Sequence, residues 1–273
     1  MRFKSLILGS AAAYFASATA AFASRPTGGA WLQEPVTPTA EGIHSVHMFV
    51  FVIITIITLF VLVLQVYIWF RFNEKRNPVP SKTTHHFGLE VAWTIIPVFI
   101  LLAIIPMSIK ELYHQDALPE TEMTVKVMAN TWNWEYAYPE YDNIEPFVSN
   151  IMEKEEAGAD YLLKTDAPLV VPVDTKVKVL LSSYNNLHSF AMPAFGVKMD
   201  AVPGRINETW FQVYEGKEGV YYGQCSEICG VKHAYMPIEI HVVSQADFQR
   251  WVANNGSYDV ATTSADKSSL AQR

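Results

Sequence analysis

Cysteine is scarce in this sequence: its 273 residues contain two, Cys225 and Cys229, with three residues between them. A scaffold held together by several disulfides is therefore excluded. The sequence also lacks a Cys-x-x-Cys-His segment, so we expect no covalently attached heme on this chain. The two cysteines are compatible with one disulfide or with a metal site, and the residues around them have to distinguish the two.

Charge is absent from residues 48–70 and nearly absent from residues 89–109, where Glu90 is the one acidic or basic residue. Each run has roughly the 20 apolar residues that a helix needs to cross a bilayer. Pro97 and Pro106 lie in the second run, and prolines are tolerated in membrane helices. We therefore expect a transmembrane hairpin over residues 48–110, with a connecting loop at 71–88.

Basic residues are rare before the first apolar helix, since residues 24–47 contain only Arg25. The connecting loop instead holds one acid, Glu74, and four bases: Arg71, Lys75, Arg76 and Lys82. Positive residues mark the cytoplasmic side of a membrane, so residues 24–47 and the chain after the second helix should lie outside the cytoplasm.

The N-terminus supports the same topology. Residues 1–23 read as a signal peptide, with two early bases, an alanine-rich apolar run and a cleavage site after Ala23 or Ala20. The alternative is a first membrane helix.

The exported part is poor in basic residues: from Glu111 to His241 there are twenty acidic and nine basic side chains, a formal charge of −11. This charge argues against nucleic acid as a partner and favours either a cationic protein partner or a merely soluble acidic surface. Apolar residues alternate with period two in short runs, which predicts β-strands. These runs lie at Met123–Val127, Leu169–Val173, Val177–Leu181, Glu208–Tyr214, Val220–Gly223 and Ile238–Val242.

We therefore expect residues 111–245 to form an all-β Greek-key domain, an antiparallel sandwich or barrel. In the last strand the alternation would point His241 outward. The remaining residues, 246–273, should form a short helix around 246–252 and then a disordered tail.

The surroundings of the two cysteines favour a metal. His233 follows Cys229 by four residues and Met236 follows by seven, so two thiols, an imidazole and a thioether lie within twelve residues. Thiolate and thioether are soft ligands that suit copper, and imidazole suits it as well. His188, at the end of the Lys176–Leu181 strand, is the candidate fourth side chain. Zinc is the rival metal, and the methionine argues against it.

At this point the chain resembles a known family, subunit II of the heme-copper cytochrome c oxidases, which carries the dinuclear copper centre CuA. The resemblance covers nearly the whole chain, and its most specific parts are Gly223–Gly230 (GQCSEICG), His233, Met236-Pro237 and Gly196–Arg205 (GVKMDAVPGR). It implies a cupredoxin-like β domain and a proton-pumping oxidase that passes electrons from cytochrome c to heme in subunit I. Oxygen reduction would take place on subunit I.

The resemblance also implies roles for individual residues. Cys225 and Cys229 would bridge both coppers, with His188 and weakly Met236 on one copper, and His233 on the other. Glu227 would add its backbone carbonyl to that second copper, and its carboxylate would reach a magnesium ion shared with subunit I.

Further roles concern electron and proton entry. Trp132 would receive the electron from cytochrome c, and Glu90 would stand at the mouth of a proton path. Four acids would dock the cytochrome: Glu135, Glu140, Asp142 and Glu145. Subunits I and III would be membrane partners in a bacterial inner membrane, with the copper domain on the periplasmic side.

The chain departs from the family pattern at two positions. Asn133 stands where an aromatic is usual, and Asn185 stands where an aspartate is common, which puts the details of cytochrome docking in doubt.

Three other functions are compatible with parts of the sequence. A quinol oxidase subunit II shares the helices and the β domain but characteristically lacks the two thiolates. A nitrous oxide reductase has a similar copper loop but needs a large catalytic domain. A structural or adhesive exported domain would use the cysteines as a disulfide.

Overall fold

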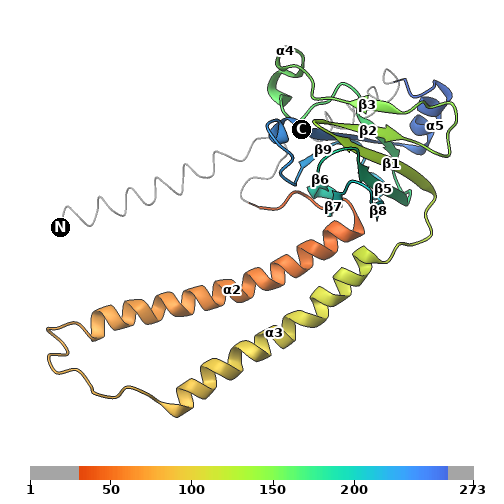
Figure 1. Cartoon of the computed structure of the whole chain (residues 1–273). Coiled ribbons are helices and arrows are strands. Elements are labelled where there is room, and N and C mark those ends of the chain that lie inside the picture. The colour runs from red at the N-terminus through yellow and green to blue at the C-terminus, as the bar shows by residue number, and fades with distance from the viewer. Residues whose placement is uncertain (1–30, 258–273) are drawn as a thin grey trace. The chain divides into compact units, whose positions relative to one another are not determined.

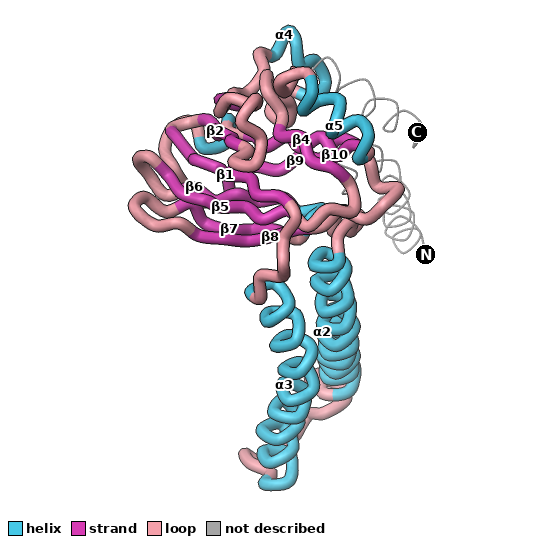
Figure 2. Tube along the Cα trace, turned by 90° about the vertical axis from the view of Figure 1, so that its right-hand side faces the viewer, coloured by secondary structure: helices cyan, strands magenta, loops and turns pink. Residues whose placement is uncertain are grey.

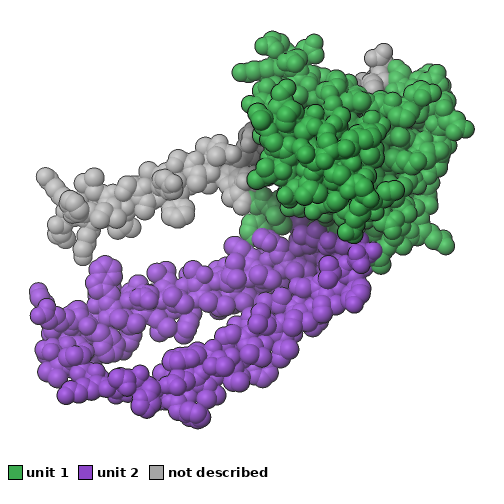
Figure 3. Space-filling model, viewed as in Figure 1, with its two compact units in different colours: residues 1–41, 117–273 green, residues 42–116 purple. Residues whose placement is uncertain are grey.

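The computed structural model describes residues 31–257. The expected signal peptide and the end of the C-terminal tail lie outside these residues. The described chain divides into two compact units, which Figure 3 colours separately. One unit is residues 42–116, and the other joins residues 117–257 to the segment 31–41.

Two long helices, α2 (Pro38–Arg71) and α3 (Phe87–Asp116), account for the apolar runs (Figure 1). Both are long and apolar enough to cross a membrane. They are longer than the predicted 48–70 and 89–109, because hydropathy marks only the apolar part of a helix. The start of α2 is set by Thr37, whose hydroxyl accepts from the Ala40 amide at 3.1 Å, and by Pro38 in the first turn. Residues 38–47, predicted as part of an exported segment, are therefore the first turns of α2.

The unit of residues 31–41 and 117–257, green in Figure 3, is built from two five-stranded sheets, shown as arrows in Figure 1 and as magenta tube in Figure 2. Strand order is β3-β2-β1-β5-β8 in one sheet and β4-β10-β9-β6-β7 in the other. The bounds in the first sheet are β1 Met123–Asn130, β2 Asn133–Ala137, β3 Phe147–Ser149, β5 Val177–Ser183 and β8 Asn207–Phe211. Those in the second are β4 Leu169–Pro172, β6 His188–Met192, β7 Val197–Ala201, β9 Gly219–Cys225 and β10 Pro237–Val243.

Most strand pairs are antiparallel, as predicted, but β1 pairs with β5 and β10 pairs with β4 in parallel. Short helical segments complete the unit: α4 (Lys154–Ala157), η2 (Gly158–Asp160), η3 (Pro193–Phe195), η4 (His233–Tyr235) and α5 (Gln245–Ala253). The two apolar helices followed by this β-sandwich confirm the predicted fold class, and the sandwich is consistent with a cupredoxin-like domain.

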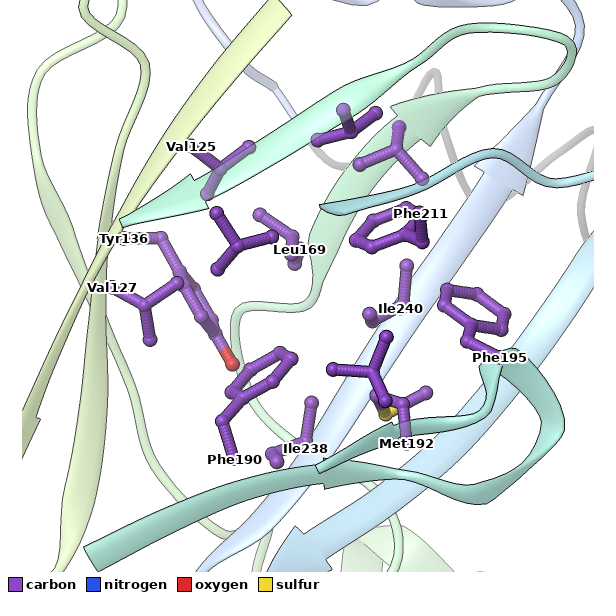
Figure 4. Close-up of a cluster of buried hydrophobic side chains, with 14 of the residues drawn as sticks. Val125, Val127, Tyr136, Leu169, Phe190, Met192, Phe195, Phe211, Ile238 and Ile240 are labelled. Atoms are coloured by element: carbon purple, nitrogen blue, oxygen red, sulfur yellow. The ribbon is translucent and has the colours of Figure 1, made fainter. Parts of the chain in front are cut away.

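The core lies between the two sheets, where the period-two residues of both sheets meet (Figure 4). Val125 and Val127 of β1 face inward with Tyr136 of β2, and Ile238 and Ile240 of β10 meet them from the other sheet. All five are fully buried. This apolar contact supplies the main stabilisation and gives the strand ends fixed positions.

One strand differs from the predicted alternation. Every residue of β10 is buried, so His241 does not point into solvent. Its Nε2 lies 2.7 Å from Glu239 Oε1, and the other carboxylate oxygen accepts from the Thr165 amide at 2.6 Å. A strand between β4 and β9 that is covered on both faces keeps polar side chains mainly where they are paired. Glu239 and His241 are paired through His241 Nε2, while His241 Nδ1 has no hydrogen-bond partner among the described residues.

Candidate metal centre

The strand order explains why distant donors converge. The strand β9 runs antiparallel to both of its neighbours, β10 and β6. The end of β9, at Cys225, is therefore adjacent to the starts of β6, at His188, and β10, which Met236 precedes. In register, Phe190 is opposite Cys225 and Pro237 is opposite Gln224. The loop from residue 226 to 236 returns to this point and adds Cys229 and His233.

Four of the predicted donors are close together. Cys225 Sγ lies 3.8 Å from Cys229 Sγ and 3.8 Å from His188 Nδ1. Cys229 Sγ lies 3.6 Å from His233 Nδ1. The donor atoms of His188 and the two cysteines all lie within 4.8 Å of one another. Both cysteines are free thiols in the structure, which does not contain the alternative disulfide between them.

The two remaining predicted ligand residues, Glu227 and Met236, are hydrogen-bonded to Cys225 through their backbone carbonyls. The backbone carbonyl of Glu227 accepts from Cys225 Sγ at 3.4 Å, so this oxygen faces the sulfurs. Met236 is 1% exposed, and its own carbonyl accepts from the Cys225 amide at 3.2 Å. The Glu227 side chain, in contrast, is exposed. One residue therefore presents its carbonyl inward and its carboxylate outward.

Burial controls the charge of the cluster. It raises the pKa of Cys229 to about 12, with the neighbouring Cys225 adding to the rise. Burial also lowers the pKa of His188, helped by His233 nearby, which keeps that imidazole neutral and able to bind a metal. A cation bound at the Cys229 sulfur would offset this rise in pKa and favour the thiolate, the form that binds a metal.

The donor set fits copper. Two thiols, two imidazoles that turn the same nitrogen toward sulfur, and a buried thioether are soft or intermediate ligands. Because Asn185 and Trp134 hold His188 from outside the cluster, the imidazole has little freedom to leave it. The predicted His/Cys cluster is thus consistent with a copper centre.

Trp132 lies against the metal loop from the opposite sheet. It sits between β1 and β2, is half-buried, and its Nε1 donates to the Cys229 carbonyl at 3.3 Å. Its ring also covers Gly230, where an added Cβ would stand 3.2 Å from the indole. Trp134, two residues on, is fully buried and meets His188 edge-on at 6.2 Å between ring centroids. The indole of Trp132 is thus hydrogen-bonded directly to the backbone of a predicted ligand.

The predicted docking acids are not all beside Trp132. Glu135 lies in β2 and accepts from the Tyr184 hydroxyl at 3.1 Å. The other three, Glu140, Asp142 and Glu145, are exposed and follow the far end of β2, a strand of five residues that spans about 17 Å. They share that end of the sandwich with α5, since Asn143 donates to the Val252 carbonyl.

Glu90 lies in the unit of residues 42–116, in the first turn of α3. Its Oε1 accepts from the His86 amide at 3.0 Å, while His86 Nδ1 accepts from the Leu89 amide at 3.2 Å. Together these bonds cap the helix N-terminus, where a negative charge is favourable. The structure therefore gives Glu90 a helix-capping contact, and the predicted proton path remains a prediction.

Sequence reasoning noted Asn185 only as a lost docking charge and missed the hydrogen bonds that a group of asparagines makes beside the cluster. Asn185, Asn186 and Asn130 form hydrogen bonds to His188, Cys229 and Thr131. A signal was present, because Asn185 precedes His188 by three residues and Asn130 precedes Trp132 by two. The hydrogen bonds between them depend on the parallel pairing of β1 with β5, which the alternation pattern does not reveal.

Comparison with known families gives two matches that together cover most of the chain. Residues 123–243 match the model of the cytochrome c oxidase subunit II periplasmic domain, and residues 26–110 match that of its transmembrane domain. The boundary between the two matches falls within a few residues of the end of α3.

Curated relatives share this similarity over most of their length. The probable cytochrome c oxidase subunit 2 of Rickettsia prowazekii is 46% identical over 236 residues, covering 85% of this chain and 74% of the relative. Cytochrome c oxidase subunit 2 of Cereibacter sphaeroides is 42% identical over 255 residues, covering 86% of this chain and 84% of the relative.

A solved structure is similar as well. The periplasmic domain of subunit II of cytochrome oxidase from Bradyrhizobium japonicum is 44% identical and covers 51% of this chain and 96% of its own, with a TM-score of 0.46.

Proposed function

The chain belongs to the cytochrome c oxidase subunit II family, and on that premise we propose that it accepts electrons from cytochrome c at a dinuclear copper centre. It would then pass them to heme in subunit I, where oxygen is reduced to water and protons are pumped. The observation that carries this proposal is the convergence of two free thiols and two imidazoles at one end of the sandwich.

We propose the following ligands from the distances above and, for Met236, from its burial. Cys225 and Cys229 would hold both coppers as thiolates, because each sulfur faces the other and one imidazole nitrogen. His188 Nδ1 and the Met236 sulfur would serve one copper. His233 Nδ1 and the Glu227 carbonyl would serve the other, and the carbonyl oxygen already faces Cys225 Sγ.

When bound, a thiolate-bridged copper pair supplies a one-electron relay with no open coordination position. The chain's own residues provide the surroundings that such a relay needs. His188, Cys225, Cys229 and Met236 are all at least 95% buried, which keeps water away from the donors. Because His188, Cys225 and Met236 lie at or next to the ends of packed strands, and Cys229 is buried in the loop between β9 and β10, the donors can keep their positions while the charge changes.

Electron entry through Trp132 is supported by its hydrogen bond to the Cys229 carbonyl. The acids would attract an approaching cytochrome c rather than contact Trp132, since the electrostatic field of each charge extends over a Debye length of about 8–10 Å. Glu135 is the acid nearest to the entry point along the chain. Docking through these acids predicts that raising the ionic strength weakens cytochrome c binding.

A proton-path role for Glu90 is supported by its position near the membrane border of α3, where an ionisable group is a functional candidate. Glu90→Gln keeps an oxygen that can accept from the His86 amide but cannot carry a proton. We expect the assembled oxidase with this substitution to fold and bind copper normally but to turn over more slowly. Turnover of the Glu90→Gln oxidase at the wild-type rate would contradict the proton-path role and leave Glu90 only its contact at the helix N-terminus.

A magnesium ion shared with subunit I is supported by the exposed carboxylate of Glu227, a hard ligand that points away from the soft cluster. Manganese can replace magnesium as a paramagnetic probe. Its signal in the assembled oxidase should change in Glu227→Gln, and an unchanged signal would contradict this assignment.

The chain is a membrane protein, and we propose the bacterial inner membrane with the copper domain on the periplasmic side. The basic loop between α2 and α3 supports this orientation, because it holds Arg71, Lys75, Arg76 and Lys82 against Glu74. The proposed partners in the membrane are subunits I and III, and we propose that this chain itself binds no heme. Protease added to the periplasmic side of spheroplasts should cleave residues 117–257 and spare the loop.

Electron paramagnetic resonance of the copper-loaded full-length chain tests the proposed centre. A mixed-valence copper pair gives a seven-line hyperfine pattern, because the unpaired electron is shared by two nuclei, and it also absorbs in the near infrared. We expect both signals. A four-line pattern would indicate a single copper and overturn the dinuclear assignment, while the absence of bound copper would overturn the proposed function.

A further inference from the structure

Asn185 is hydrogen-bonded in two directions at the rim of the metal cluster. It lies in the turn between β5 and β6, three residues before His188. Its Oδ1 is 3.4 Å from His188 Nε2 and accepts from the Asn186 amide at 2.7 Å. Its Nδ2 is 2.6 Å from Asn130 Oδ1 and 2.6 Å from Thr131 Oγ1. One side-chain amide thus contacts both a predicted ligand and the segment that leads into Trp132.

The contact with His188 bears on which ring nitrogen is free. His188 Nδ1 faces Cys225 Sγ at 3.8 Å, so this is the nitrogen that has to be unprotonated to bind a metal. The proton of the neutral ring then sits on Nε2. The Asn185 carbonyl oxygen is the acceptor placed for that N–H, and a partner of this kind fixes both the tautomer and the ring orientation of a metal-binding histidine.

The other end of Asn185 holds the electron-entry segment. Asn130 Oδ1 accepts from the Thr131 amide at 2.9 Å as well as from Asn185. Trp132 follows directly, and its indole donates to the Cys229 carbonyl. The amide of Asn186 reaches the same carbonyl at 3.5 Å. Hydrogen bonds therefore run from His188 through Asn185 to the residues before Trp132, and from Trp132 back to the metal loop.

We propose that Asn185 is a positioning residue that holds His188 in its metal-binding orientation and, through Asn130 and Thr131, holds Trp132 against the Cys229 carbonyl. This inference rests on the proposed function. An aspartate here could still accept from His188, but it has no N–H to donate and would bring a negative charge to 2.6 Å from the Asn130 oxygen. Asn185, which lacks the negative charge of the aspartate common in the family, therefore supplies an N–H donor in its place. With its two ends it connects Asn130 and Thr131, at the end of β1 in one sheet, to His188 in the other.

Two substitutions separate the two ends of the amide in the copper-loaded full-length chain. Asn185→Ala removes both, and we expect copper to be lost to a chelator about tenfold more readily, the lower end of the range for an outer-shell partner of a metal ligand. Asn185→Asp keeps the acceptor for His188, so copper retention should match the wild type. Its electron transfer from saturating cytochrome c should nevertheless slow, because Asn130 and Thr131, which precede Trp132, lose the Asn185 Nδ2 donor.

The matched control is Asn77→Asp, which makes the same chemical change in the loop between α2 and α3, outside the β domain. It should alter neither measurement. Saturating cytochrome c separates a changed first-order rate from the binding effect of the new charge. Circular dichroism should show that each variant keeps the wild-type fold.

Each result decides one part of the proposal. Wild-type copper retention in Asn185→Ala would overturn the role toward His188. A wild-type first-order rate in Asn185→Asp would overturn the role toward Trp132, and this variant remains informative if the alanine variant does not fold. A wild-type chain that forms no copper pair would instead refute the proposed function itself.

Discussion

Replacing Cys229 with serine is expected to abolish the paired-copper signal and, with it, the oxidation of cytochrome c by the assembled oxidase. The Cys229 sulfur is the donor atom that touches both Cys225 Sγ, at 3.8 Å, and His233 Nδ1, at 3.6 Å. A serine hydroxyl is a hard ligand that stays protonated, so it cannot bridge two coppers. We expect the seven-line pattern to disappear entirely and turnover to fall to that of copper-free oxidase.

Ser226→Ala is the matched control, because Ser226 lies in the same loop next to Cys225 but its side chain is exposed. It should leave the pattern and the turnover unchanged. The remaining donors of Cys229→Ser resemble the His, Cys and Met set of a single-copper site, so a four-line pattern or loss of copper are both consistent with the prediction. Persistence of the seven-line pattern would contradict the bridging assignment.

The sequence correctly predicted which residues face the core in strands that have one buried face and one solvent-exposed face. The strand β1 alternates between buried and less buried residues, and β5 does the same. The strand β6 was not predicted, because four of its five residues are buried and no alternation remains. The same cause explains His241: β10 is covered on both faces, so period two says nothing about exposure there.

The helix ends were predicted less well than the helices. Hydropathy finds the apolar part of α2 but carries no information on where the backbone stops being helical. The Thr37 hydroxyl, which bonds to Ala40 and to the Phe195 carbonyl, places that start ten residues earlier than Met48. The second bond joins residues 158 positions apart, which a local pattern cannot anticipate.

The candidate site was predictable to the extent that its donors are local. Cys225, Cys229, His233 and Met236 lie within twelve residues, and the chemistry of that set already favoured copper. His188 could be proposed from the sequence, but its place depends on the pairing of β6 with β9. The asparagine contacts depend on the pairing of β1 with β5, and only the folded chain shows them.

The strand topology therefore brings the residues of the metal site together at one end of the sandwich. The end of β9 meets the starts of β6 and β10, and the parallel pair β1 and β5 ends at the same place. The turn after β5 crosses to the other sheet there and carries Asn185 into His188. The loops that border the metal cluster all begin at strands that are paired within a sheet. A substitution at Trp132 should therefore affect electron transfer without unfolding the metal site.

Trp132 is where this separation can be measured. Trp132→Ala removes the indole that donates to the Cys229 carbonyl and covers Gly230, while every predicted copper donor remains. We expect the seven-line pattern to persist and electron transfer from cytochrome c to fall by about a hundredfold, the loss typical of misplacing a reacting group by about 1 Å. Trp132→Phe keeps an aromatic ring over Gly230 but loses the hydrogen bond, so it should give an intermediate rate.

A small-molecule reductant that reaches the copper centre directly is the control, and it should reduce both variants as fast as the wild type. Reduction by cytochrome c at the wild-type rate in Trp132→Ala would refute the entry assignment. Equal slowing with both reductants would instead mean that the substitution disturbs the copper centre. Selective slowing with cytochrome c alone would show that the path from donor to copper runs through the indole and the Cys229 backbone.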